Sequence, residues 1–329
     1  MSSVICKQHP VDIEPIFCLR ILEENYISAN YNLRKNNTIA LKVDFIEQDL
    51  FDTYLEEIID LSLREDIGEG DHTSLSTIPD NAERKAVLLV KDNGIIAGID
   101  LAKIIFNKVD PLLKMDCLMH DGDQVQEGDF AFFVTGPAQS ILTAERLVLN
   151  FMQRLSGIAT QTNILSRQVG KFGVKLLDTR KTTPGLRLLE KWAVKVGGGT
   201  NHRIGLFDMI LIKDNHIDYA GGVTQAVENV LEYLKKKKLD LKIEVELRSF
   251  ADIEEALKLN CIDRVLLDNF SPEDLRKAVV LIDGKVETEA SGGIHEGNIL
   301  AYAKTGVDYI SSGALTHTVK PLDLSLKIT

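Results

Sequence analysis

The first half of the chain alternates between helical and strand-like patterns of apolar residues. Leu55, Ile58 and Ile59 recur at helical spacing, and Gly68 follows where such a helix would end. Residues 84–98 predict two strands joined by an Asn-Gly turn, the pattern of a hairpin. The other elements predicted in this half are a short helix over 100–110, a buried strand before Gly136 and a long amphipathic helix over 138–162.

After about residue 170 the pattern becomes a regular alternation of buried strands and amphipathic helices. The predicted strands are 174–178, 209–213, 242–247, 264–268, 285–291 and 309–313. Such alternation indicates a parallel sheet with crossover helices. Six clear strands and one weaker one predict an open (β/α) barrel related to the TIM barrel, and a doubly wound open sheet is the alternative.

The two ends of the chain differ from the regular part. Residues 1–48 are rich in polar residues and show no strong periodicity, so we expect an irregular N-terminal extension there. The segment 317–329 ends in one further strand-like run, which we expect to return to the first domain.

Composition and charge narrow the classes of function. The 329 residues carry a formal net charge of -11, which argues against nucleic acid as a partner. No apolar run is long enough to cross a membrane, and the N-terminus lacks the pattern of a signal peptide. The four cysteines are scattered without a CxxC pair, so we expect reduced thiols and a cytoplasmic protein.

Charged residues or glycines follow every predicted strand of the second half. The strand ends deliver Asp178, Arg180 and Lys181; Lys213 to His216; Glu246 and Arg248; Asp268 and Asn269; Ser291 to Gly293; and Ser311 to Gly313 with His317. In a parallel barrel the carboxyl ends of the strands form one rim, where the active site lies. The sequence therefore predicts a charged site at that rim.

The cations of this rim predict an anionic ligand. Four permanent cations and one histidine are involved, namely Arg180, Lys181, His202, Arg203 and Lys213. Arginine suits carboxylates and phosphates because its guanidinium group is a planar fork of donors. A surface ion pair explains any one of these residues alone, but the set indicates a ligand with several negative charges.

Carboxylates and glycines add a second part to the predicted site. Glu246 and Asp268 beside phosphates would imply Mg²⁺ or a ribose diol between them. The Ser-Gly-Gly and Ser-Ser-Gly strand ends would let backbone N–H groups approach a phosphate, although tight turns also require glycine.

The block DTRKTTPGLRLLEKWAVKVGGGTNHRIGLFDMILIKDNH, residues 178–216, closely resembles the signature of the quinolinate phosphoribosyltransferases, the carboxylating nicotinate-nucleotide pyrophosphorylases. Shorter blocks agree with it: 64–74, 145–160, 244–247, 266–270, 289–294 and 310–317. The resemblance runs from about residue 50 to the C-terminus. It implies an N-terminal α/β sandwich, here 49–155, and an open α/β barrel, here 156–316.

The resemblance also implies the reaction and its participants. Quinolinate and phosphoribosyl pyrophosphate would give nicotinate mononucleotide, pyrophosphate and CO2 in de novo NAD synthesis, with Mg²⁺ required. It further implies a homodimer, or a higher oligomer built from it, whose active sites are shared between subunits.

Roles for single residues follow from the same resemblance. Arg180, His202, Arg203 and Lys213 would hold the two quinolinate carboxylates, together with Arg146 of the partner subunit. Lys181 would lie between quinolinate and the pyrophosphate, and Glu246 and Asp268 would bind the ribose hydroxyls and the metal, directly or indirectly; these three are the predicted catalytic residues. The 5′-phosphate pocket would be lined by Ser291, Gly292, Gly313 and His317.

Two other functions are compatible with parts of the pattern. A nicotinate phosphoribosyltransferase would face only one carboxylate, so the surplus of cations disfavours it. A non-catalytic sensor of phosphorylated metabolites would not need both Glu246 and Asp268. Arg187 lies inside a predicted helix, and we expect it to form an ion pair rather than to bind ligand.

Overall fold

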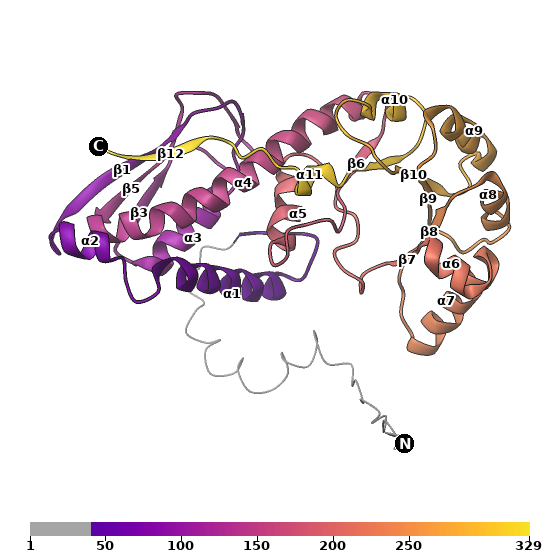
Figure 1. Cartoon of the computed structure of the whole chain (residues 1–329), viewed down its shortest axis with the longest axis horizontal. Coiled ribbons are helices and arrows are strands. Elements are labelled where there is room, and N and C mark those ends of the chain that lie inside the picture. Colours follow the sequence, from indigo (N-terminus) through magenta and orange to yellow (C-terminus); the bar gives the residue numbers. More distant parts are fainter. Residues whose placement is uncertain (1–40) are drawn as a thin grey trace, which may run out of the picture. The chain divides into compact units, whose positions relative to one another are not determined.

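The computed structural model describes residues 41–329 (Figure 1), so residues 1–40 of the predicted extension lie outside the described part. The helices are α1 Gln48–Ile67, α2 His72–Thr77, α3 Ile99–Val109, α4 Ala138–Gly170, α5 Arg187–Val196, α6 Asp214–Ala220, α7 Val223–Lys237, α8 Phe250–Ala256, α9 Pro272–Ile282, α10 Ile299–Ala303 and α11 Ala314–His317. The strands are β1 Glu83–Val90, β2 Gly94–Ile95, β3 Lys114–Cys117, β4 Gln124–Val125, β5 Phe130–Pro137, β6 Lys175–Leu177, β7 Ile210–Ile212, β8 Ile243–Leu247, β9 Arg264–Asp268, β10 Glu287–Ser291, β11 Tyr309–Ser311 and β12 Leu324–Ile328.

The first sheet is a four-stranded antiparallel sheet in the order β12-β1-β5-β3. Its outer strand β12 comes from the C-terminal segment, so that segment returns to the first domain as its sequence predicts. The predicted hairpin over 84–98 is wrong, because β2 pairs with β4 and not with β1. Both edges of β1 are already taken by β5 and β12, strands that come from far along the chain.

The second sheet confirms the predicted barrel. Its six strands pair in parallel in the order β6-β11-β10-β9-β8-β7, so the last strand of the alternation pairs with the first. A doubly wound sheet would reverse its strand order in the middle, and this sheet does not. The ring of strands is open between β6 and β7, where Leu177 makes a single parallel bridge to Thr200.

Helix α4 connects the two sheets. Its 33 residues include buried positions along its whole length, and it contacts α3 and β5 as well as α5 and β6. The expected domain boundary between residues 155 and 156 falls inside this helix. Because α4 is continuous there, it forms a shared wall for both sheets.

Local capping fixes the helices that follow two barrel strands. The Ser249 hydroxyl accepts a hydrogen bond from Asp252 N (3.2 Å) at the start of α8, and Ser271 accepts one from Asp274 N (3.1 Å) at the start of α9. Pro272 occupies the first turn of α9, where its missing N–H costs nothing. The chain therefore turns into a helix immediately after β8 and β9, which leaves the strand ends at the rim.

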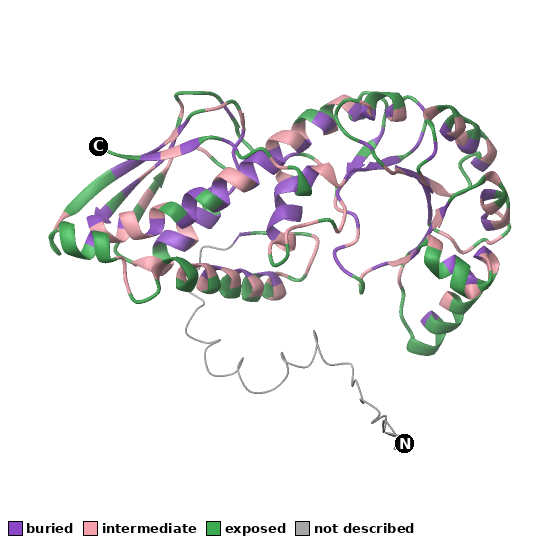
Figure 2. Cartoon of the chain, in the orientation of Figure 1, coloured by how far each residue is buried: buried purple, intermediate pink, exposed green. Residues whose placement is uncertain are grey.

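Buried residues follow the strands of both sheets, and exposed residues mark the outer faces of α6 to α9 (Figure 2). Leu41, just before α1, is 2% exposed and belongs to the apolar core. Within residues 41–329 no helix combines the length and apolar character that spanning a membrane requires.

Candidate active site

The carboxyl ends of the parallel strands bring the predicted site residues to one rim. Arg180 and Lys181 follow β6 and Lys213 follows β7, while Glu246 lies in β8 and Asp268 ends β9. Ser291 ends β10, and Gly313 and His317 lie just beyond β11. Because the six strands are parallel, their carboxyl ends share one side of the barrel.

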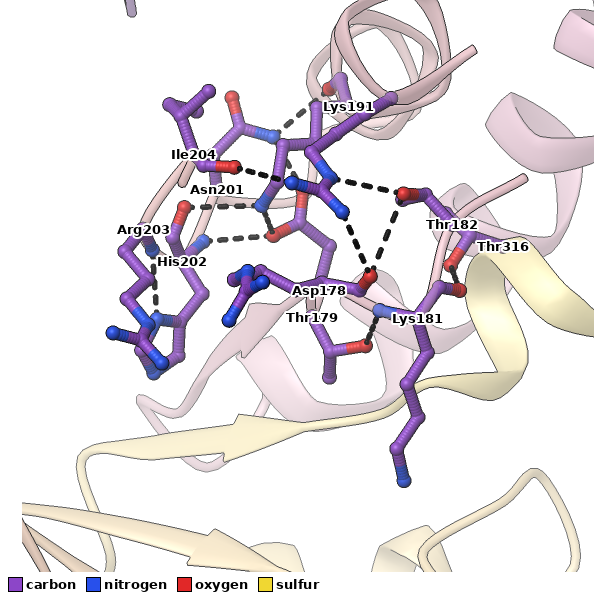
Figure 3. Close-up of polar contacts among 12 residues, drawn as sticks. Asp178, Thr179, Lys181, Thr182, Lys191, Asn201, His202, Arg203, Ile204 and Thr316 are labelled. Carbon is purple, nitrogen blue, oxygen red and sulfur yellow. Dashed lines mark hydrogen bonds and ion pairs between the residues drawn. The ribbon is translucent and has the colours of Figure 1, made fainter. Parts of the chain in front are cut away.

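A buried ion pair supports the strand end that carries Arg180. Lys191 Nζ of α5 donates to Asp178 Oδ1 at 2.5 Å, and both side chains are fully buried (Figure 3). Asp178 also accepts hydrogen bonds from Asn201 Nδ2 (2.6 Å) and from the backbone N–H of His202 (2.8 Å). One carboxylate thus ties the end of β6 to the loop that carries His202 and Arg203.

The loop after β6 is fixed from the side of α4. Arg154 donates to Glu190 Oε1 (2.6 Å) and to Thr183 Oγ1 (2.7 Å). Thr316 Oγ1 of α11 donates to the carbonyl oxygen of Lys181 (2.8 Å), and in Figure 3 the Lys181 side chain extends away from these contacts. The Lys181 backbone is therefore held while its ammonium group stays exposed to a ligand.

Arg187 stabilises the same loop but not through the expected ion pair. Its guanidinium donates to Thr182 Oγ1 (3.1 Å) and to the carbonyl oxygens of Ile204 (3.4 Å) and Arg180 (3.5 Å). Among the described residues no carboxylate forms a salt bridge with it. The ion-pair prediction is wrong because the neighbouring loop offers carbonyl oxygens at that position.

Two guanidinium groups repel each other at the rim. Burial lowers the pKa of Arg203, and the positive charge of Arg180 lowers it further. The Nε atom of Arg180 is buried and has no hydrogen-bond partner among the residues that the structure describes. An unpaired buried donor beside a second cation is unfavourable in the protein alone and is relieved by an anion.

Two carboxylates face the same space from neighbouring strands. Burial raises the pKa of Glu246, and the nearby charge of Asp268 raises it further. Burial also raises the pKa of Asp268, and Asp214 adds to the rise while Lys181 and Lys213 oppose it. Glu246 and Asp268 are therefore close enough to repel each other. The positive charges of Lys181 and Lys213 partly offset this repulsion.

Glycine permits close approach at two predicted phosphate-binding positions. A Cβ atom at Gly313 would lie 2.9 Å from Cδ of Lys181 and 3.1 Å from Cδ2 of His317. Gly292 has a φ of 99°, and a Cβ atom there would overlap Oδ1 of Asn269. A side chain at either position would therefore collide with neighbouring residues of the rim.

His202 differs from the other cation candidates because protein groups engage both of its ring nitrogens. Nε2 lies 2.9 Å from Glu244 Oε2 and 3.4 Å from Glu289 Oε2, and Nδ1 accepts a hydrogen bond from Arg203 N (2.7 Å). Burial lowers the pKa of His202, but Glu244 and Glu289 outweigh it and raise the pKa to about 9. The hydrogen bond to Nδ1 opposes that rise because it requires a free lone pair.

Arg146 is not brought to the rim. It is an exposed residue of α4, in the part of that helix nearest β5, and no contact joins it to the other candidates within residues 41–329. The remaining predicted residues share the rim: Arg180, Lys181, His202, Arg203, Lys213, Glu246, Asp268, Ser291, Gly292, Gly313 and His317.

Sequence reasoning missed the buried charges beneath the rim. Glu244, Glu289 and Arg264 have little or no exposed side chain, yet all three lie on strands. The signal was present in the period of two along β8 and β10, because Glu244 shares a strand face with Glu246, and Glu289 with Ser291. Helix α6 was also missed, since Ile217 is its only buried residue.

Family models match most of the described chain. The N-terminal domain of quinolinate phosphoribosyl transferase matches residues 71–156, and the C-terminal domain matches residues 158–327. The division between these two matches falls within α4.

Proteins of known name and structure resemble the chain over most of its length. Quinolinate phosphoribosyltransferase [decarboxylating] 1b of Nicotiana tabacum is 47% identical over 94% of this chain and 93% of its own. A chloroplastic carboxylating nicotinate-nucleotide pyrophosphorylase of Arabidopsis thaliana is 47% identical over 83% of this chain and 82% of its own. The solved nicotinate-nucleotide pyrophosphorylase of Francisella tularensis is 41% identical, with a TM-score of 0.80, over 89% of this chain and 100% of its own.

Proposed function

The chain belongs to the quinolinate phosphoribosyltransferase family, and we propose that it joins quinolinate to phosphoribosyl pyrophosphate. The products are nicotinate mononucleotide, pyrophosphate and CO2. This reaction is the step by which quinolinate enters NAD synthesis. The observation that carries this proposal is the pair of mutually repelling guanidinium groups, Arg180 and Arg203, at the rim. Two such groups with an unpaired buried donor suit a ligand with two carboxylates.

The site divides into two proposed halves. Arg180, His202, Arg203 and Lys213 form the quinolinate side, and Lys181 lies between the two substrates. The phosphoribosyl side comprises Glu246, Asp268, Ser291, Gly292, Gly313 and His317. The closeness of Gly313 to both Lys181 and His317 supports a phosphate pocket at that point, because a glycine backbone, an ammonium group and an imidazole converge there.

Mg²⁺ fits the carboxylates of the phosphoribosyl side. Glu246 and Asp268 repel each other, and both pKa values are raised, so a divalent cation between them and the substrate would relieve the repulsion. Oxygen ligands from one or two carboxylates together with substrate phosphates are the usual environment of this ion. When bound, Mg²⁺ would neutralise charge on the pyrophosphate.

The chain's residues act mainly by positioning and by charge. The cations of the quinolinate side hold the ring so that its nitrogen faces the ribose carbon. As the bond to that nitrogen forms, the bond to pyrophosphate breaks, and the Lys181 ammonium stabilises the departing charge. The new pyridinium ring accepts the electron pair of the 2-carboxylate bond, CO2 leaves, and the ring carbon takes a proton from solvent. No covalent bond to the enzyme is needed.

The reaction predicts stoichiometric release of CO2. With carboxyl-labelled quinolinate, phosphoribosyl pyrophosphate and Mg²⁺, we expect one CO2 for each pyrophosphate released, and loss of both when EDTA removes the metal. Nicotinate should be a poor substitute because it leaves one set of cations unpaired. Activity with nicotinate alone would contradict the proposal, and binding of both substrates without turnover would indicate a sensor.

We also propose a homodimer with shared active sites. Arg146 is exposed and separate from the rim, as expected if it serves a neighbouring subunit. Beside the open edge of the barrel at β7, a pocket of about 490 Å³ is lined in part by Leu206 and Tyr219, which are 70% and 93% exposed, and Phe207 nearby is 61% exposed. Large exposed apolar side chains beside an unpaired strand edge favour contact with another subunit.

Shared active sites predict complementation between inactive variants. Arg146→Ala and Arg180→Ala should each abolish most activity alone. If the two residues come from different subunits, random mixing makes half the dimers mixed, each with one native site, so about a quarter of wild-type activity returns. Co-expression with two different tags, followed by the CO2 assay, measures this fraction. Mixtures of either variant with itself are the control, and a lack of recovery in purified mixed dimers would refute the sharing of Arg146.

A reducing compartment suits the thiols that the structure describes. Cys117 and Cys261 are free, while Cys6 and Cys18 lie outside the described residues. Burial raises the pKa of both described thiols, which keeps them in the less reactive protonated form. The cytoplasm remains the compartment that we propose, although the Arabidopsis relative is named chloroplastic.

A further inference from the structure

A buried charge cluster lies beneath the quinolinate side of the rim. We use this name for Glu244, Glu289, Arg264 and His202, each of which is at most 9% exposed. Glu289 Oε2 lies 3.3 Å from Nη1 of Arg264 and 3.4 Å from Nε2 of His202, so it bridges the guanidinium group and the imidazole ring. Glu244 approaches the same imidazole nitrogen from the other strand, at 2.9 Å.

The position of the cluster follows from the alternation of side chains along strands. Glu244 and Glu246 lie on one face of β8, and Glu287, Glu289 and Ser291 lie on one face of β10. Since Glu246 and Ser291 reach the rim, Glu244 and Glu289 lie one layer deeper in the same interior. Apolar branched side chains dominate this layer in most barrels of this kind. Charges there are unfavourable unless other groups compensate them, so the presence of two glutamates in this layer needs a physical explanation.

The two glutamates hold the imidazole ring of His202 in one orientation. Its Nε2 lies within ion-pair distance of two carboxylates, so rotation of the ring would lose contacts on two strands. Both Glu244 oxygens are buried and have no other hydrogen-bond partner within residues 41–329, which leaves this carboxylate dependent on the imidazole. Nδ1 is then left facing the chain and accepts the hydrogen bond from the backbone N–H of Arg203 at 2.7 Å. A fixed imidazole thus fixes the backbone from which the Arg203 guanidinium extends to the rim.

Arg264 lets the two carboxylates stay together. Its Nη1 meets Glu289, its Nη2 meets Glu287 at 3.2 Å, and its guanidinium stacks over the ring of Tyr309 at 3.9 Å. Glu287 also accepts a hydrogen bond from the Tyr309 hydroxyl at 3.0 Å. Glu287 therefore shares Arg264 with Glu289, but its contacts run to Tyr309 rather than to His202.

We propose that Glu244 and Glu289 are positioning residues of the quinolinate subsite, which act through the His202 ring to orient Arg203. This proposal rests on the proposed function, because it assumes that Arg203 binds quinolinate. Neither carboxylate would touch substrate. His202 and the two glutamates also offer donor atoms within 4.8 Å of one another, which could hold a metal ion, but the positive charge of Arg264 beside Glu289 opposes that use.

The test compares Glu289→Gln with Glu287→Gln. The two residues share strand β10, the inward face and Arg264, and only Glu289 contacts His202. We expect Glu289→Gln to raise KM for quinolinate about tenfold to a hundredfold, the effect of misplacing a binding group, while KM for phosphoribosyl pyrophosphate changes less than about twofold. Glu287→Gln should leave both KM values near those of the wild type.

A double-variant cycle tests whether the effect passes through the imidazole. In a His202→Asn background, adding Glu289→Gln should raise KM for quinolinate no further, because the ring that Glu289 orients is gone. Glu244→Gln approaches the same ring from β8 and should behave alike, which keeps the test decisive if Glu289→Gln fails to fold.

Other outcomes would overturn the proposal. Equal changes in both KM values, or an equal effect of Glu287→Gln, would make the cluster a structural element only. Additive effects of Glu289→Gln and His202→Asn would mean that the carboxylate acts by another route. Binding of one equivalent of Zn²⁺ or Mn²⁺ by the wild type, lost in Glu289→Gln, would replace positioning by a metal site. Absence of CO2 release by the wild type would instead refute the proposed function.

Discussion

Arg203→Ala is expected to lower kcat/KM for quinolinate by about 10²-fold to 10³-fold without unfolding the protein. Truncating one partner of a desolvated, hydrogen-bonded charge pair costs about 2–5 kcal/mol, which corresponds to about 30-fold to 4,000-fold and so includes the expected loss. The stability of the free protein should change little. Within residues 41–329 the Arg203 side chain makes only a long hydrogen bond to Met209 O (3.4 Å), and the repulsion from Arg180 opposes the attraction of Asp208 and Glu244. Steady-state kinetics and a thermal melt measure the two effects.

Arg248→Ala is the matched control for this change. Arg248 also follows a barrel strand at the rim, but its guanidinium is already paired with Asp218 at 2.8 Å. We expect the control to leave kcat/KM within about twofold, since an exposed ion pair contributes little. Arg203→Lys should recover part of the loss because it restores the charge but not the fork. A collapse of the melt in Arg203→Ala, with the control intact, would make Arg203 a structural residue.

The barrel was predictable because its signals are local and repeated. Each strand is a short apolar run, and the charges that follow it are placed by the topology alone. The order of the sheet, with β11 beside β6, then excludes the doubly wound alternative, which local patterns could not do. The rim residues could be named for the same reason, since parallel strands bring their carboxyl ends together.

The hairpin failed because strand pairing is not local. An Asn-Gly turn favours a hairpin between its flanking strands, yet β1 pairs with β5 and with β12, more than 200 residues away in the chain. β2 is left with only two residues and pairs with β4. The choice of partner depends on which distant strands can pair along the two edges of β1, and the turn carries no information on that.

The sequence also could not predict which neighbours the side chain of a rim residue contacts. The position of His202 in the sequence predicts a residue of the rim, but two glutamates from β8 and β10 contact its ring from inside the barrel. In the sequence those glutamates resemble ordinary charged positions, and only the curved sheet of the open barrel buries them. The resemblance to a known family named His202 as a ligand-binding residue, whereas the contacts indicate a residue that also transmits position from the interior to Arg203.

The sequence block that identifies the family contains both binding and supporting residues, and the structure separates them. Arg180 faces the site, and its Nε has no partner within residues 41–329, whereas Asp178, two residues earlier, is fully buried and holds the neighbouring loop. Lys191, thirteen residues after Asp178, completes the support. A short motif can thus encode a ligand contact and the scaffold beneath it, and stability measurements distinguish the two.

Lys191→Met is expected to destabilise the fold by about 3–5 kcal/mol, the usual effect of removing one partner from a buried ion pair. Burial raises the pKa of Asp178 and lowers that of Lys191, so it disfavours the charged form of each group. Each group therefore depends on the opposite charge of the other to stay ionised. Without the ammonium group, the Asp178 carboxylate keeps, within the described part of the chain, only Asn201 and the N–H of His202 as partners. Chemical denaturation measures the free energy, and KM for quinolinate should rise as the His202 loop loosens.

Lys195→Met on the same helix provides the control. Lys195 lies one turn further along α5 and pairs with Asp44 at 2.7 Å, but the two side chains are 38% and 70% exposed. Water screens this pair, so its loss should cost no more than about 1 kcal/mol. Adding Asp178→Asn to Lys191→Met should destabilise less than the sum of the two single changes, because no unpaired charge then remains. Equal losses in the free energy of unfolding for Lys191→Met and Lys195→Met would show that burial does not strengthen the dependence of the fold on the Asp178–Lys191 pair.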